Sequence, residues 1–243
     1  MLLLKPDHFR YGNTRCGMKE KSKNKAGGLQ QNALVFFLPA AVLIVIGILI
    51  SIIMGREGSH ILINSHHHPF MDSLMKIWTL LGDGAWVLFI VGAAIFIKMR
   101  YFLILALSYI LSGLSAQLLK RLVFKGMPRP EKYFELHAID YDLFIVPGYD
   151  PHSWHSFPSG HTATAFGLFF GISLLLRSKL LQVLCLVLAL GVAYSRIYLS
   201  EHFLMDVLGG AVLGMASAYL AIAWMRMYQK DWLEKPLQKI LLK

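Results

Sequence analysis

Long apolar runs separated by short polar segments dominate the chain. The first run, 33–54, has about the 20 residues that an α-helix needs to cross a bilayer, and it is longer than the apolar core of a signal peptide. Backbone N–H and C=O groups inside a bilayer must be paired within the segment, so each run predicts a helix. The predicted fold class is all-α, a six-span transmembrane helical bundle over residues 33–54, 85–97, 101–120, 162–176, 180–198 and 203–225.

Residues 70–81 show the pattern of an amphipathic helix. Phe70, Leu74 and Trp78 fall on one face, and the charged positions fall off it. Such a helix is expected to lie in the membrane interface. Asp83 follows between two glycines, and a carboxylate inside a continuous span is costly. We therefore predict an interfacial helix that ends in a turn at Asp83.

The longest polar segment covers residues 125–157, and its many aromatic residues predict a folded outer loop. His152 and His155 lie three apart between prolines, which favours an incidental pair in a loop. Residues 55–69 are predicted to form a polar loop, and its adjacent histidines 66–68 lack the spacing of a known metal site. No metal site is predicted from either group.

Composition supports the membrane class independently. Of the 243 residues, 56% are hydrophobic and 16% are charged, which is more apolar than a soluble domain. The net charge of +10 raises the question of nucleic acid, but basic residues cluster beside the apolar runs, where they would face anionic lipid. We expect the bilayer as a partner and no nucleic acid. Cys16 and Cys185 are expected to be free.

Loop charge predicts the orientation. The N-terminal tail, the short basic turns 98–100 and 177–179, and the C-terminal tail fall on one side, which the positive-inside rule makes the cytoplasm. The loop at 125–157 then lies outside. The predicted parts are a basic cytoplasmic tail (1–32), a transmembrane domain (33–228) and a cytoplasmic tail (229–243), with both termini cytoplasmic.

A charged stretch, 195–206, lies between the last two apolar runs. His202 and Asp206 are four apart, so they share one face if they open a helix. The carboxylate would then hold one imidazole nitrogen as an N–H donor and leave the other free as a nucleophile. The guanidinium of Arg196 suits a phosphate. The alternative is that Arg196 snorkels at a membrane boundary and that His202 is merely interfacial.

Residues 157–161 open the apolar run 162–176. Pro158 followed by Ser159 as an N-cap predicts a helix start whose first amides are unpaired. Together with the helix dipole, these amides form an anion site, and His161 would stand beside it as an acid–base group. The alternative is an ordinary capped helix start.

A third stretch, 120–130, places several cations after an apolar run. Positive charge at a helix end is frequent in membrane proteins. The predicted orientation, however, puts this stretch on the outer side, where an excess of Lys and Arg is not expected. Lys120, Arg121 and Lys125 are the candidates for a phosphate contact there.

Together the three stretches resemble the signature of the type 2 phosphatidic acid phosphatase family, the integral-membrane lipid phosphate phosphatases. That signature is a Lys, six residues and Arg-Pro; then Pro-Ser-Gly-His; then Ser-Arg, five residues, His, three residues and Asp. Residues 158–161 and 195–206 match it in full. The first stretch departs, because Leu122 stands seven before Arg129. We assign the lysine to Lys120, with a short insertion before Arg129.

The resemblance implies a metal-independent phosphatase that needs no cofactor and works through a phosphohistidine. His202 would attack phosphorus, and Asp206 would fix its tautomer. His161 would protonate the leaving oxygen and then activate water. The phosphate would be held by Lys120, Arg129, Ser159, Gly160 and Arg196.

The resemblance also implies a membrane lipid phosphate as substrate, and the short chain favours the bacterial type. Undecaprenyl diphosphate, a phosphatidyl phosphate and a lipid A phosphate all fit a site at the outer interface of the inner (cytoplasmic) membrane, facing the periplasm or exterior. Two alternatives stay open. One is a phosphotransferase of the same fold with an acceptor other than water. The other is a non-enzymatic membrane bundle, which would need neither His161 nor His202.

Overall fold

The computed structural model describes residues 16–242, with side chains from Leu34 onward. This part of the chain holds helices and loops but no strand, so the predicted all-α class is confirmed. The elements are α1 (Cys16–Asn64), α2 (Pro69–Trp78), η1 (Thr79–Gly82), α3 (Gly84–Ala93), η2 (Ala94–Phe96), α4 (Met99–Leu118), η3 (Leu119–Val123), α5 (Pro130–Leu136), α6 (Gly160–Leu175), α7 (Lys179–Tyr198), α8 (Leu204–Met225), η4 (Asp231–Glu234) and α9 (Leu237–Leu241).

Four helical segments are long and apolar enough to cross a membrane: Leu34–Asn64, Met99–Val123, Lys179–Tyr198 and Leu204–Met225. A fifth crossing results if the pair Pro69–Gly82 and Gly84–Phe96, bent by 56°, forms one span. The chain is therefore a multi-pass membrane protein. Helix α6 is apolar but shorter, and the count of six spans stays a prediction.

The break at Asp83 was predicted, and it is confirmed. Asp83 has extended backbone and caps α3, because its carboxylate accepts a hydrogen bond from the Ala85 amide at 2.8 Å. The preceding helix runs from Pro69, close to the predicted start. Its interfacial position stays a prediction.

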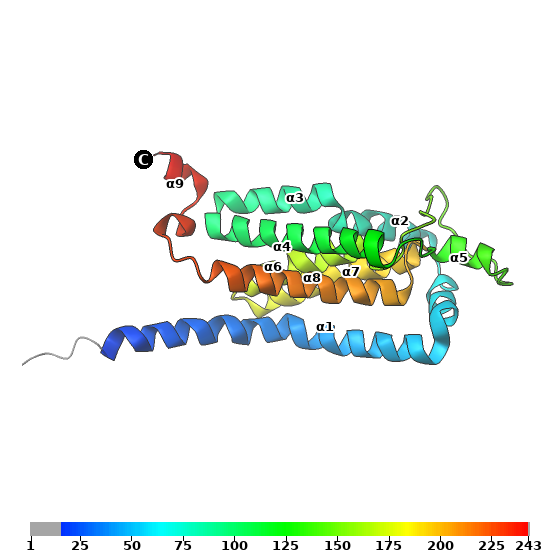
Figure 1. The fold of residues 1–243 in the computed structure, drawn as a ribbon, viewed down its shortest axis with the longest axis horizontal. Coiled ribbons are helices and arrows are strands. Elements are labelled where there is room, and N and C mark those ends of the chain that lie inside the picture. The colour runs from blue at the N-terminus through cyan, green and yellow to red at the C-terminus, as the bar shows by residue number, and fades with distance from the viewer. Residues whose placement is uncertain (1–15, 243) are drawn as a thin grey trace, which may run out of the picture.

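Helix α6 lies at the centre of the bundle and contacts α1, α4, α7 and α8 (Figure 1). Twelve of its 16 residues are buried. Glycines on α8 allow this close packing. A Cβ atom on Gly214 would lie 2.3 Å from the Ala163 carbonyl oxygen, and one on Gly210 would lie 2.5 Å from the Ser159 carbonyl oxygen. The small residues of α8 thus allow α6 and α8 to approach closely.

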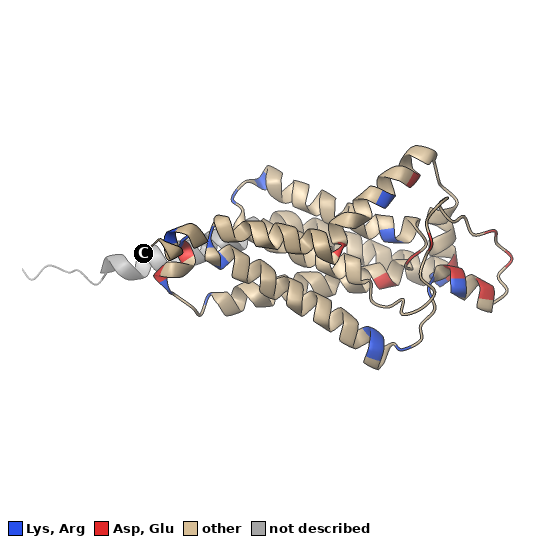
Figure 2. Cartoon of the chain, turned by 90° about the horizontal axis from the view of Figure 1, so that it is seen from above, with Lys and Arg blue, Asp and Glu red and all other residues tan. Residues whose placement is uncertain are grey.

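The outer surface of the bundle is apolar along its length. Charged residues gather towards the two ends in Figure 2, and most of the helical surface between them carries none. Large apolar side chains are exposed along α1, including Ile52 and Ile53, the latter at 81%. An apolar belt between charged ends is the arrangement expected of a lipid-facing surface.

Helix α1 bends sharply at Gly55, whose φ of 72° and ψ of 179° are not helical. The chain then turns across the end of the bundle as a second helical segment that ends at Asn64 (Figure 1). The sequence predicted a polar loop over 55–69, which was wrong for most of this range. Within the segment, His60 and Asn64 are buried and contact Ser200 Oγ at 3.3 and 3.2 Å.

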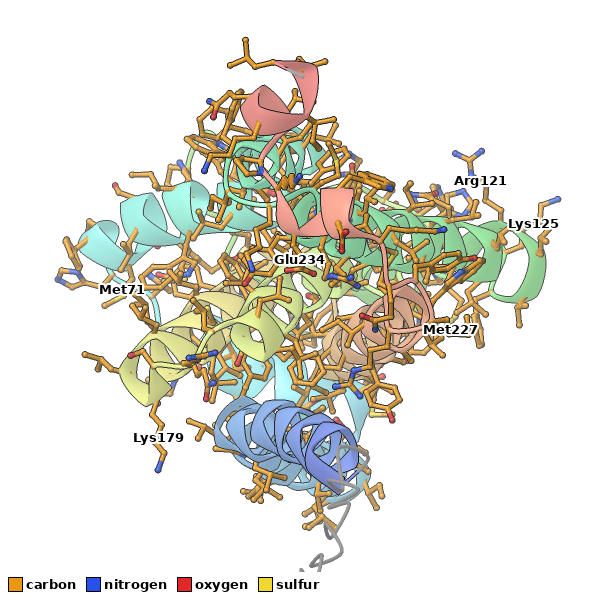
Figure 3. All side chains as sticks on the ribbon, turned by 90° about the vertical axis from the view of Figure 1, so that its left-hand side faces the viewer. Met71, Arg121, Lys125, Lys179, Met227 and Glu234 are labelled. Atoms are coloured by element: carbon orange, nitrogen blue, oxygen red, sulfur yellow. The ribbon has the colours of Figure 1, made fainter. Side chains whose placement is uncertain are left out.

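The opposite end of the bundle is held by the C-terminal segment. Glu234 pairs with Lys98 at 3.0 Å and with Arg100, both at the start of α4. Leu233 is buried, and Figure 3 shows this end with Glu234 near its centre. Within the predicted tail 229–243, the η4 segment thus packs against the bundle. The cytoplasmic location of the tail stays a prediction. Of the predicted N-terminal tail, residues 1–15 lie outside the described residues, as do the side chains up to 33.

Candidate active site

The three stretches singled out in the sequence meet at one end of the bundle, here called the motif end, where α7 finishes and α6 and α8 begin (Figure 1). Charged side chains buried in a bundle are costly unless they are paired or bind a ligand. Six of the predicted site residues are nevertheless almost fully buried: Lys120, Arg129, Ser159, Arg196, His202 and Asp206.

His202 and Asp206 are neighbours, although they do not share a helical face. Helix α8 begins at Leu204, so His202 lies before it and Asp206 lies in its first turn. The condition for a shared helical face, that both residues open a helix, is therefore not met. Asp206 Oδ2 lies 3.6 Å from His202 Nδ1 and accepts hydrogen bonds from the Phe203 amide at 2.9 Å and from Ser156 Oγ at 2.5 Å. The carboxylate thus faces Nδ1 and leaves Nε2 as the nitrogen for chemistry.

Ser159 caps α6, as predicted. Its hydroxyl oxygen accepts hydrogen bonds from the Thr162 amide at 3.4 Å and the Thr162 hydroxyl at 2.9 Å. The Ser159 amide donates to the Asp206 carbonyl oxygen at 2.8 Å, which ties the start of α6 to α8. The cap uses the Thr162 amide, which leaves the amides of Gly160 and His161 without a partner within the helix and available to an anion.

Lys120 reaches this helix start. A Cβ atom built on Gly160 would lie 3.9 Å from Lys120 Nζ, so the ammonium group lies beside the α6 N-terminus. Arg121 and Lys125 are exposed, and Figure 3 shows both pointing away from the bundle. Of the three candidate cations, only Lys120 is directed inward. It lies in η3, a π-helical turn at the end of α4.

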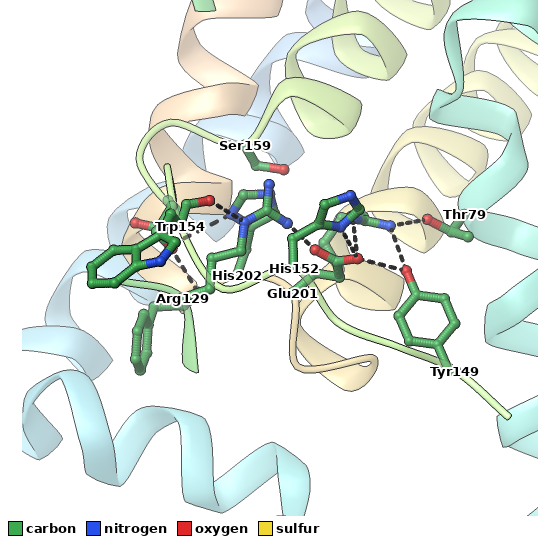
Figure 4. A network of polar contacts seen from close by, with 12 residues as sticks. Thr79, Arg129, Tyr149, His152, Trp154, Ser159, Glu201 and His202 are labelled. Carbon is green, nitrogen blue, oxygen red and sulfur yellow. Dashed lines mark hydrogen bonds and ion pairs between the residues drawn. The ribbon is translucent and has the colours of Figure 1, made fainter. Parts of the chain in front are cut away.

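Arg129 and Arg196 converge on a single carboxylate, that of Glu201 (Figure 4). Arg129 Nη1 pairs with Glu201 Oε2, and Arg196 Nη2 lies 3.3 Å from Glu201 Oε1. Arg129 Nε also donates to the Trp154 carbonyl oxygen at 2.9 Å. Arg196 Nη1 donates to Thr79 Oγ1 at 2.6 Å, whereas its buried Nε has no hydrogen-bond partner.

The segment 125–157 folds back over these groups, as its aromatic content predicted. Tyr149 donates to Glu201 Oε1 at 2.8 Å, and His152 Nδ1 lies 3.1 Å from the same oxygen (Figure 4). His152 therefore contacts Glu201, a contact that the interpretation of His152 and His155 as an incidental pair did not predict. A bridge between Pro128 and Trp154 holds the two arms of the segment together.

His161 occupies the first turn of α6, with its side chain about one-third exposed. Its Nε2 lies 4.0 Å from Asp83 Oδ2. It is the more accessible of the two motif histidines, since the side chain of His202 is 1% exposed. An accessible histidine beside a buried one suits a group that exchanges protons with water.

The electrostatics of the site keep His202 neutral. Burial lowers the pKa of His202 well below 6.5, and the positive charges of Arg129, Lys120 and Arg196 lower it further. Burial and the charge of Arg196 lower the pKa of Arg129 to about 10. The charge of Asp206 raises this pKa and so offsets part of the lowering. The site therefore combines cations, which attract a phosphate, with an unprotonated imidazole, which can attack one.

Four contributors escaped the sequence analysis: Glu201, Ser156, Tyr149 and Thr79. Glu201 directly precedes His202, and a carboxylate beside a cluster of cations was the available signal. Ser156 and Tyr149 lie in a loop without periodicity, so nothing local marks their direction. Within the described residues, no three His, Cys, Asp or Glu side chains gather as metal ligands would, at residues 66–68 or elsewhere.

Comparison with known proteins places this site in a family. A family model described as the PAP2 superfamily matches residues 98–230, more than half of the chain. The chain belongs to the PAP2 superfamily. The matched part contains all the motif residues, from Lys120 to Asp206. The recognition based on the three motifs is confirmed.

Several relatives of this chain are named as phosphatases of a lipid. The chain is 34% identical to a lipid A 1-phosphatase of Rhizobium johnstonii, over 43% of this chain and 40% of the relative. It is 27% identical to a lipid A 4'-phosphatase of Bacteroides thetaiotaomicron, over 65% and 71%. It is 28% identical to the undecaprenyl-diphosphatase BcrC of Bacillus subtilis, over 64% and 76%. The match thus spans about two fifths of the Rhizobium relative.

Two solved PAP2 structures resemble this fold. The crystal structure of Aquifex aeolicus LpxE has a TM-score of 0.57 at 28% identity and covers 68% of this chain and 92% of its own. A transmembrane PAP2 type phosphatidylglycerolphosphate phosphatase from Bacillus subtilis has a TM-score of 0.58 at 24% identity, covering 82% and 98%. The second likeness concerns the fold alone.

Proposed function

We propose that this PAP2 protein is a membrane lipid phosphatase that hydrolyses a phosphomonoester or diphosphate through a phosphohistidine. One observation carries the proposal. The buried, neutral His202 has Asp206 at its Nδ1 and is surrounded by the charges of Lys120, Arg129 and Arg196. Phosphoryl transfer depends mainly on positioning and on stabilising spread negative charge, and this cluster supplies both together with a nucleophile.

The first step transfers the phosphoryl group to the enzyme. The Nε2 atom of His202 attacks phosphorus, the bond between phosphorus and the lipid oxygen breaks, and a phosphorus–nitrogen bond forms. Burial and the charge of Arg196 lower the pKa of His161 to about 3 in the free site, so His161 takes up a proton when the phosphate anion binds beside it, and it gives this proton to the departing oxygen. Asp206 stabilises the positive charge that develops on the His202 ring.

The second step returns the enzyme to its starting state. His161, now unprotonated, takes a proton from water, whose oxygen attacks the phosphohistidine. The phosphorus–nitrogen bond breaks, which releases inorganic phosphate and neutral His202. Lys120, Arg129, Arg196 and the α6 N-terminus hold the non-bridging oxygens in both steps.

The substrate class follows from the location of the site. The motif end lies at one end of the apolar belt, where lipid head groups reside. The names of the relatives support lipid A phosphates and undecaprenyl diphosphate as candidates. We propose that the site faces the periplasm or exterior, since the start of α1 at Cys16, the basic turns and the C-terminal segment with η4 lie at the other end.

The test is phosphate release by the purified protein from lipid A, undecaprenyl diphosphate and phosphatidyl phosphates. His202→Ala should abolish release from whichever substrate is used, and His161→Ala should lower kcat by about 100-fold or more. His66→Ala, which alters an exposed histidine outside the site, is the matched control. Near wild-type turnover by His202→Ala would overturn the assignment.

A further inference from the structure

Glu201 is a buried carboxylate that the proposed reaction does not use. It is 1% exposed and contacts Arg129, Arg196, Tyr149 and His152. Its two oxygens divide the contacts. Oε2 takes Arg129, whereas Oε1 takes the other three. A side chain with this many charged and polar partners is held in a single orientation and holds its partners in turn.

Two guanidinium groups held in one buried site repel each other. The charge of Arg196 contributes to lowering the pKa of Arg129 to about 10, after burial. Without a carboxylate between them, the two side chains would be driven apart or towards solvent. Glu201 removes this repulsion, and one N–H direction of each arginine is committed to it.

Glu201 does not use all the N–H donors of the two arginines, and one of the remaining donors is unpaired. Arg196 Nε is buried and without a hydrogen-bond partner, although its Nη1 and Nη2 are both engaged. Both arginines lie close enough to His202 for their charges to lower its pKa. A buried, unpaired N–H on an arginine whose charge acts on the nucleophile is the feature expected where an anion completes the site.

We propose that Glu201 is a positioning residue that fixes Arg129 and Arg196 so that their unused N–H groups face a phosphoryl group on His202. Tyr149 and His152 from the segment 125–157 in turn fix Glu201, which couples the folding of that segment to the phosphate site. The inference rests on the proposed function in so far as the two arginines bind phosphate. The rival arrangement is that Glu201 occupies the phosphate position and competes with it.

The test compares Glu201→Gln and Glu201→Asp with wild type. The amide of Gln keeps the size of the side chain but not its charge, whereas Asp keeps the charge on a shorter stem. Positioning predicts that Glu201→Gln raises KM and the inhibition constant of inorganic phosphate together, by about tenfold or more, with Asp intermediate. Glu57→Gln is the matched control, because Glu57 accepts a hydrogen bond from Tyr133 and lies outside the site.

A fall in the inhibition constant of phosphate in Glu201→Gln would favour the competing arrangement and overturn the proposal, as would values unchanged from wild type. If Glu201→Gln does not fold, Tyr149→Phe removes one contact of Glu201 and should shift both constants in the same direction, by a smaller factor. No rise in Tyr149→Phe would then overturn the proposal.

Thermal stabilisation by inorganic phosphate separates the two proposals, because it needs no turnover. A wild-type protein that phosphate stabilises, but that hydrolyses no lipid phosphate, would overturn the proposed function only. Glu201→Gln should then need about tenfold more phosphate for the same rise in Tm. A wild-type protein that phosphate neither stabilises nor inhibits would overturn the inference about Glu201.

Discussion

The Nδ1 atom of His202 lies 3.6 Å from Asp206 Oδ2, an oxygen that Ser156 and the Phe203 amide already hold in place. Asp206 is therefore fixed before substrate binds, and in the proposed mechanism it determines which imidazole nitrogen carries the proton. Asp206→Asn keeps the shape but loses the charge that stabilises the imidazolium, so kcat should fall by about 100-fold or more.

The measurement is the rate of phosphate release at saturating substrate, together with Tm. Asp72→Asn serves as the control, because Asp72 accepts a hydrogen bond from Tyr198 and belongs to none of the three motifs. Ser156→Ala should lower kcat less than Asp206→Asn does. Wild-type kcat in Asp206→Asn would remove Asp206 from the mechanism.

The inward direction of Lys120 leads to a second prediction. Met replaces most of the stem of a lysine but not its charge, so Lys120→Met removes a charge-assisted hydrogen bond to phosphate. Such a bond contributes about 1.5–3 kcal/mol, which predicts a loss of roughly ten- to over a hundredfold in kcat/KM.

The exposed neighbours Arg121 and Lys125 supply matched controls. Arg121→Met and Lys125→Met should retain kcat/KM within about twofold of wild type, because surface substitutions away from a site have small effects. If either neighbour proved more damaging than Lys120→Met, the assignment of Lys120 would be wrong, and those of His161, His202 and Asp206 would stand.

Chelation tests the proposed independence from metals. In the proposed site, side chains and helix amides balance the phosphate charge, so activity should survive an excess of EDTA. The measurement is phosphate release before and after dialysis against EDTA, followed by addition of magnesium, manganese or zinc. Loss of activity that one of these ions restores would show that the histidine scheme is incomplete.

The depressed pKa of His202 predicts how stability depends on pH. Unfolded His202 binds a proton near pH 6.5, whereas the folded protein resists protonation because of burial and of nearby cations. Below pH 6.5 the unfolded state therefore binds more protons, and the free energy of unfolding falls as the pH falls. This contribution is fully present above pH 6.5.

The loss from His202 begins as the pH falls through about 6.5 and cannot exceed about 1.36 kcal/mol per unit of pH for one proton. Thermal unfolding in detergent should show a steeper acid loss of Tm for wild type than for His202→Asn. Equal slopes for the two proteins would mean that His202 titrates normally in the folded state.

The sequence by itself determined the helices and the identity of the motif residues. Apolar runs near 101–120, 180–198 and 203–225 became α4, α7 and α8, because in a bilayer a run of apolar residues has no alternative to pairing its own backbone. The break at Asp83 and the cap at Ser159 were equally predictable, since each depends on a local hydrogen bond.

Only the tertiary structure decided how the site is built. Glu201 meets Arg129 across 72 positions, and Ser156 meets Asp206 across 50, so neither pairing leaves a mark in the local pattern. Lys120 points inward from a π-helical turn. Residues 56–64, which were expected to belong to a loop, form a helical segment after the bend at Gly55. Local spacing predicts which residue types can do the chemistry. The packing of α6 against α7 and α8 decides which atoms meet, because a buried charge keeps its place only where the fold provides a partner.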